Sequence, residues 1–185
     1  MANVFERKAG AFLFLGAAQF LILLIVAEAL YPGYSTSSNF ISDLGVGPSS
    51  YIFNPSVFFL GLCMALASHF ISKASGGRIL PALLLLSGIG AMGVGIFHET
   101  DFTPHYASAF LAFSCGALSA LYCFRILRPP FSYFSAFLGI FSLAALCLSM
   151  AHVDLGLGPG GIERMIVYPI LAWALSFSGM LLSRE

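Results

Sequence analysis

The chain has 185 residues, of which 59% are hydrophobic and only 9% are charged, and its formal net charge is zero. Soluble domains carry roughly 25% charged residues, so this composition excludes an ordinary soluble domain. A balanced net charge gives no electrostatic reason to expect a nucleic-acid partner. The mean hydropathy of +0.94 indicates a membrane protein.

Six long apolar stretches divide the chain, and each is long enough to cross the hydrocarbon core of a bilayer as a helix. Backbone polar groups must be satisfied within the bilayer, and the alternating pattern of a β-barrel is absent, so helices are expected. We predict one all-α domain over residues 1–185, a polytopic bundle of six transmembrane helices. The predicted spans cover residues 9–31, 55–72, 79–98, 104–127, 131–152 and 162–182.

The first span follows Arg7 and Lys8, as the core of a signal peptide would. Its apolar run covers residues 9–26, which exceeds the roughly 7–15 residues of a signal-peptide core. We therefore expect this segment to be retained as a helix that ends at Pro32-Gly33.

A long loop, residues 34–45, follows the first span. Its apolar residues are spaced as one face of a short interfacial helix: Phe40, Ile41 and Leu44. Ser37 or Ser38 is expected to cap that helix. Ser42 and Asp43 would then lie over the mouth of the bundle, as a hydroxyl beside a carboxylate. A loop that serves only capping and interfacial contacts is the alternative.

The basic residues gather on one side of the predicted topology. Seven of the eight Lys and Arg residues flank the termini and the second and fourth loops, and only Arg164 lies elsewhere. By the positive-inside rule both termini are expected in the cytoplasm. The chain would then be a multi-pass protein of the plasma membrane, with its first, third and fifth loops facing the exterior. The seven residues are Arg7, Lys8, Lys73, Arg78, Arg125, Arg128 and Arg184.

Three histidines gather at the outward end. His98 is expected to end the third span, His105 to open the fourth, and His152 to end the fifth at the same depth. Three imidazole nitrogens with a carboxylate such as Asp154 suit a catalytic zinc site with one open position. Polar residues also gather at helix ends because water and headgroups are there, and this alternative stays open. Haem is not expected, because these histidines do not face each other within the helices.

Arg164 follows a glycine-rich turn at the start of the sixth span. With Glu163 and the free N–H groups of that helix end, it could bind the anionic end of a substrate. Alternatively, Arg164 pairs with Glu163, Asp154 or Asp43 and locks the mouth of the bundle. Glu28 lies within the first span, where an acid is costly, so we expect it to be paired or to line a wet cavity.

Three segments carry a family resemblance. They are residues 39–45 (Asn-Phe-Ile-Ser-Asp-Leu-Gly), residues 95–105 through His98, and Gly161-Ile162-Glu163-Arg164 followed by Trp173. Together they resemble the motifs of domain of unknown function 998 (DUF998), a family of small polytopic membrane proteins. His98 departs from the Phe-Pro that commonly precedes the acid in that family. The resemblance covers essentially the whole chain, implies six helices and leaves the function open.

Ser42, Asp43 and the three histidines also form a constellation similar to that of membrane hydrolases of the ceramidase and adiponectin-receptor type. Those enzymes use a Ser, an Asp and three His residues around zinc. The chain lacks their His-x-x-x-His pair and has six spans where they have seven. This resemblance implies a zinc-dependent hydrolase.

The leading hypothesis is therefore a metal-dependent hydrolase that acts on a membrane lipid or another amphiphile. The expected zinc ligands are His98, His105 and His152, the catalytic residues Ser42, Asp43 and Asp101, and the substrate-binding residues Glu28, Glu163 and Arg164. Such an enzyme predicts a polar pocket that ends near the outer interface. A protein that binds or transports a small molecule or protons predicts polar groups continuing to the cytoplasmic side. A structural protein predicts an Arg164–carboxylate pair and no cavity.

Overall fold

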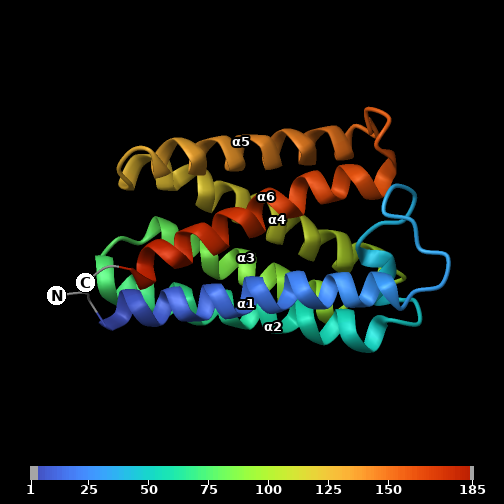
Figure 1. Ribbon diagram of the computed structural model, residues 1–185, viewed down its shortest axis with the longest axis horizontal. Coiled ribbons are helices and arrows are strands. Elements are labelled where there is room, and N and C mark those ends of the chain that lie inside the picture. The colour runs from blue at the N-terminus through green and yellow to red at the C-terminus, as the bar shows by residue number, and fades with distance from the viewer. Residues whose placement is uncertain (1–3, 184–185) are drawn as a thin grey trace.

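The computed structural model describes residues 4–183 and shows a bundle of long helices (Figure 1). Within this range, six helices are long and apolar enough to cross a membrane, which confirms the predicted all-α, six-helix fold of an integral multi-pass protein. Arg184, one of the basic residues used for orientation, lies outside the described residues. The elements are α1 (Val4–Ala29), the 3₁₀ helix η1 (Ser42–Gly45), α2 (Ser50–Ser75), α3 (Ile79–Ile96), α4 (Phe102–Ile126), α5 (Phe131–Met150) and α6 (Gly158–Leu182).

Several helix ends differ from the predicted limits. Helix α2 continues through Pro55 and begins at Ser50. Helix α6 begins at Gly158 and carries Pro159 in its first turn, where the missing N–H of proline costs no helical bond. Helices α3 and α5 end earlier than expected, at Ile96 and Met150, so the histidines predicted at their ends lie in the following loops.

Five helices form a closed ring. Helix α1 packs against α2, α2 against α3, α3 against α4 and α4 against α6, and α6 in turn packs against α1. Helix α5 lies outside this ring, packs against α4 and α6, and runs along one edge of the bundle in Figure 1. The ring therefore has an interior that α1, α2, α3, α4 and α6 share.

Small residues bring the ring helices into close contact. A Cβ on Gly90 of α3 would lie 2.4 Å from the backbone nitrogen of Ala112 in α4. Ser87 donates a hydrogen bond across the same contact to the Ala112 carbonyl, at 2.8 Å. Gly95 instead packs against α2, where its Cβ would meet the Asn54 carbonyl. The small residues of α3 thus allow close packing against both of its neighbours, α2 and α4.

The two ends of the bundle are unlike. Both termini lie at one end, which we call the terminus end (Figure 1). The α1–α2 loop, the turn after α3 and the turn after α5 lie at the other end, which we call the loop end. The loop end therefore collects the acids and histidines of the turns after α1, α3 and α5.

Candidate functional site at the loop end

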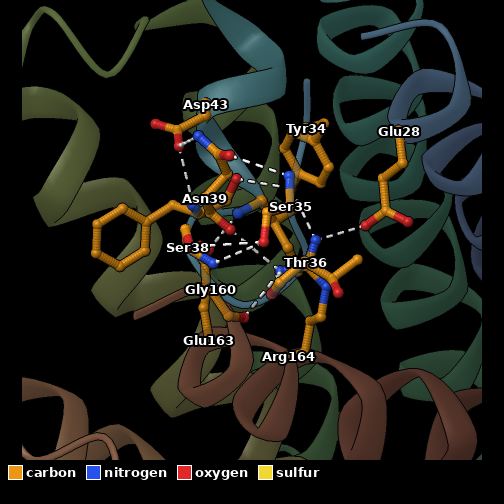
Figure 2. A network of polar contacts seen from close by, with 12 residues as sticks. Glu28, Tyr34, Ser35, Thr36, Ser38, Asn39, Asp43, Gly160, Glu163 and Arg164 are labelled. Atoms are coloured by element: carbon orange, nitrogen blue, oxygen red, sulfur yellow. Dashed lines mark hydrogen bonds and ion pairs between the residues drawn. The ribbon is translucent and has the colours of Figure 1, made fainter. Parts of the chain in front are cut away.

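Arg164 of α6 holds the α1–α2 loop against the bundle (Figure 2). Its Nη2 lies 2.5 Å from Glu28 Oε1 and donates to the Tyr34 hydroxyl at 2.7 Å. Its Nη1 donates to three carbonyl oxygens: those of Thr36 (2.9 Å), Asn39 (3.3 Å) and Gly160 (2.8 Å). The guanidinium thus joins α1, the loop and the first turn of α6.

Arg164 was expected either to bind the anionic end of a substrate or to pair with an acid, and the structure shows the pair. Arg164 is 5% exposed, and its charge is paired with Glu28 rather than directed at a ligand. Glu28 is therefore paired, one of the two states expected for an acid within a span. We call this part of the network the lock, because Arg164 pairs with the charge of Glu28 and its hydrogen bonds fix the positions of three carbonyl groups.

Tyr34 extends this lock into the loop. Its hydroxyl accepts from Arg164 and donates to the Phe40 carbonyl at 2.8 Å. Burial raises the pKa of Tyr34 to about 12, although the adjacent guanidinium acts in the opposite direction. The phenol therefore keeps its proton, and its hydrogen bond to Phe40, throughout the physiological pH range.

Asp43 organises the remainder of the loop. Its Oδ2 accepts from Asn39 Nδ2 and from the Phe40 N–H, both at 2.9 Å (Figure 2). The short interfacial helix expected here is the 3₁₀ helix η1, and neither Ser37 nor Ser38 caps it. Ser37 instead donates to the Leu157 carbonyl at 2.6 Å and so links the loop to the turn before α6.

Glu163 of α6 contacts the same loop from the interior of the bundle. It is 9% exposed, and its Oε2 accepts the Ile41 N–H at 2.5 Å. Its carboxyl interacts electrostatically with those of Asp43 and Glu99. Within residues 4–183 none of these three acids forms an ion pair. Three carboxyl groups therefore lie close together, and the nearby cation, Arg164, forms its ion pair with Glu28 instead.

Glu99, in the turn between α3 and α4, is the most perturbed of the acids outside the spans. Burial raises its pKa to about 7, and the neighbouring carboxyl of Asp43 adds to the rise, while Ser42 acts against it. Its Oε2 is buried and has no hydrogen-bond partner within the described chain. At neutral pH Glu99 is therefore close to half-protonated.

This pKa predicts how stability depends on pH. Because folded Glu99 holds its proton more tightly than unfolded Glu99, its stabilising contribution is fully present below the unfolded pKa of 4.5. That contribution falls as the pH rises to about 7. Unfolding midpoints measured across this range should decline in the wild type and decline less in Glu99→Gln. Parallel curves for the two proteins would contradict the assignment.

His105 is the one predicted zinc ligand that is buried. It is 4% exposed, and its Nδ1 lies 2.8 Å from the Phe97 carbonyl, so Nδ1 carries the proton and Nε2 is an acceptor. His98 and His152 are exposed, as is Asp101. Among residues 4–183 no group of three or more His, Cys, Asp or Glu side chains could hold a metal ion. Zinc at His98, His105 and His152 stays a prediction, and the residues present do not form its ligand set.

A cavity of about 80 Å³ lies inside the ring beneath the η1 loop, and we call it the loop-end cavity. All five ring helices contribute to its lining, which is mostly apolar. Its main polar lining residues are Ser42, His105 and Glu163 at the loop end, with Ser87 deeper in the bundle. Of the residues predicted as a site, the structure therefore brings Ser42, His105 and Glu163 together around one space.

Sequence reasoning missed two contributors to this end of the bundle. Tyr34 completes the binding of Arg164, and Glu99 completes the group of three acids. Glu99 stood within a recognised motif, but only the fold shows that it faces Asp43 rather than a histidine. Tyr34 has no periodicity or motif that marks it.

A family comparison gives the wider relationship. The model of the family described as "Protein of unknown function (DUF998)" matches residues 14–179, which is most of the chain. No curated protein and no solved structure matches the chain. The similarity to ceramidases and adiponectin receptors therefore gains no support.

Proposed function

This chain belongs to the DUF998 family, and we propose that it binds a small amphiphile in the loop-end cavity. The ligand would have a short apolar part and a cationic end that donates hydrogen bonds. The observation that carries this proposal is an apolar cavity whose loop end is lined by a buried acid, Glu163, and a buried imidazole, His105, with an unused acceptor nitrogen.

The charges near the cavity favour a cation. Glu163, Glu99 and Asp43 interact electrostatically, and Arg164, the nearby cation, is already paired with Glu28. Repulsion among three carboxyls at a site of low dielectric is costly, and a bound cation would relieve it. An anionic headgroup would add to that repulsion, so the proposal excludes the anion-binding role predicted for Arg164.

The polar groups that line the loop-end cavity favour a ligand that donates hydrogen bonds. With its proton on Nδ1, His105 offers Nε2 as an acceptor, and within residues 4–183 Nε2 has no partner. Glu163 uses Oε2 for the Ile41 N–H. A ligand that donates hydrogen bonds to these acceptors gains affinity and selectivity.

The size of the cavity limits the apolar part. A water needs roughly 10–15 Å³ of this kind of space, so the loop-end cavity accepts about five to eight water-sized groups. A short alkyl segment fits that space, whereas a complete lipid chain does not. The apolar lining, which includes Phe20, Val57 and Leu171, stabilises such a segment at about 0.8 kcal/mol for each buried CH₂.

Binding of n-butylguanidinium tests the proposal, because this probe is a permanent cation with several donors and a short tail. Calorimetry on the purified chain in detergent should show saturable binding to the wild type. Glu163→Gln keeps an acceptor for Ile41 but removes the charge, and it should weaken binding about tenfold or more. Asp154→Asn changes an exposed acid at the same end and should leave the affinity unchanged.

Two outcomes would contradict this proposal. Pentanoate, which has the opposite charge and a similar tail, should not bind, and equal binding of both probes would mean that charge plays no part. Stoichiometric zinc in the purified protein, lost in His105→Ala, would favour the metal-dependent hydrolase of a lipid or amphiphile instead.

We also propose how the bundle is oriented in the membrane. The exposed basic residues Arg78 and Arg128 lie in turns between helices at the terminus end, and exposed Arg125 lies in the last turn of α4, which favours the cytoplasm for that end. The loop-end cavity would then open toward the outer side of a plasma membrane. Labelling of a cysteine introduced at exposed Ser38, with an impermeant reagent on intact cells, tests this orientation.

A further inference from the structure

A second cavity lies at the terminus end of the bundle. Its volume is about 250 Å³, and the same five ring helices line it. Its polar lining includes Glu6 of α1, Ser75 of α2 and Tyr122 of α4. We call it the terminus-end cavity. Both cavities therefore lie in the interior of one ring, at opposite ends.

The same faces of the ring helices line both cavities. On α2, Leu60 and Met64 line the loop-end cavity and Ile71 lines the terminus-end cavity, with Ala67 between them. Residues three and four apart share one face of a helix, so these four side chains form one stripe. On α3 the stripe runs from Ala91 and Ser87 of the first cavity through Leu84 to Leu80 of the second.

Helix α6 also lines both cavities, and the spacing of its lining residues gives the distance between the two cavities. Ala174 lines the loop-end cavity and Phe177 lines the terminus-end cavity, three residues further along. Three residues of α-helix rise only about 4.5 Å, and the seven residues from Ser87 to Leu80 rise about 10 Å. The wall between the cavities is therefore one to two helical turns thick.

We call this wall the septum and define it as Leu13, Ala67, Leu84 and Ala120. All four side chains are at most 1% exposed and belong to one hydrophobic cluster. Two of them are alanines, so Leu13 and Leu84 supply most of the volume. A thin apolar constriction between two wider spaces blocks ions and polar solutes while it is closed.

We propose that the two cavities are halves of one path through the bundle, closed by the septum, and that the small cationic amphiphile of the proposed function crosses the membrane along it. This inference rests on the proposed function for the identity of the solute. It differs from a polar channel, because the middle of the path is apolar and only its two ends are polar. Passage therefore needs a transient opening at Leu84.

Efflux of labelled n-butylguanidinium from phosphatidylcholine vesicles that contain the full chain tests the path. Its permanent charge keeps the probe from crossing lipid unaided. Wild-type vesicles should release it faster than protein-free vesicles, and Leu84→Ala, which widens the septum, about tenfold faster again. Ala120→Val, which narrows the septum, should slow release to nearly the protein-free rate. Co-encapsulated calcein should stay inside in every case.

A matched control separates the septum from a general loss of packing. Leu85 is the neighbour of Leu84 but is 42% exposed toward the membrane, so Leu85→Ala should release the probe at the wild-type rate. If wild type and Leu84→Ala both release no faster than protein-free vesicles while calorimetry still shows binding, the path is wrong and the proposed function stands. If calorimetry shows no binding, the proposed function fails.

Discussion

Arg164→Met is expected to lower the free energy of unfolding by about 3–5 kcal/mol, the range for breaking a buried ion pair by removing one partner. The variant would leave Glu28 inside α1 without its cation and would leave the Thr36, Asn39 and Gly160 carbonyls without their shared donor. Unfolding in mixed micelles, followed by circular dichroism against denaturant concentration, measures the loss.

Two further variants show that this cost arises from the pair. Arg128 is exposed in the turn between α4 and α5, so Arg128→Met should change stability by less than about 0.5 kcal/mol. The double variant Glu28→Met with Arg164→Met removes both charges and should recover part of the loss. A single Arg164→Met variant as stable as Arg128→Met would show that the lock contributes nothing.

The six-helix fold could be predicted because the bilayer leaves few choices. Each apolar stretch is long enough to span, and a helix is the one way for a single stretch to satisfy its own backbone there. The helix limits were less accurate, because proline and glycine are tolerated in the first turns. Helix α2 begins at Ser50 rather than at Pro55, and Gly158 to Gly161 lie inside α6, although residues 50–54 and 158–161 were predicted to lie outside the spans.

These small shifts changed the predicted site. Helix α3 ends at Ile96 because Phe97 is extended, and the chain after α5 turns through His152 at φ 57°. His98 and His152 thereby leave the helices on which their convergence with His105 was predicted. A shift of two residues at a helix end rotates a side chain by about 200°, so sequence alone could not fix a three-histidine geometry.

The partner of Arg164 was equally beyond the sequence. Glu163, Asp154 and Asp43 were the expected partners, but Arg164 pairs with Glu28, which is 136 residues away along the chain. The choice depends on α1 and α6 lying side by side, which follows from closure of the ring and not from any local pattern. The cavities could not be predicted from the sequence either, because the residues that line them have the same spacing as those of any packed helix face.

Gly160→Ala tests whether the loop must touch α6 closely for the loop end to form. A Cβ on Gly160 would lie 1.9 Å from the Asn39 carbonyl oxygen and 2.7 Å from that of Thr36. Both carbonyls are bound by Arg164, and the Gly160 N–H donates to the Ser37 carbonyl at 2.9 Å, so the loop cannot move away without losing these bonds. We expect a loss of about 1–3 kcal/mol in the free energy of unfolding.

Gly179→Ala is the matched control on the same helix. A Cβ there meets nothing within 4 Å, so this variant should be neutral or more stable by about 0.5–1 kcal/mol, the gain of alanine over glycine within a helix. Gly160→Ala should also weaken n-butylguanidinium binding, because a displaced loop moves Ile41 and with it the buried Glu163 carboxyl. If Gly160→Ala lost stability but kept full affinity, the cavity would be formed by the helices alone and the loop would be no part of the binding site.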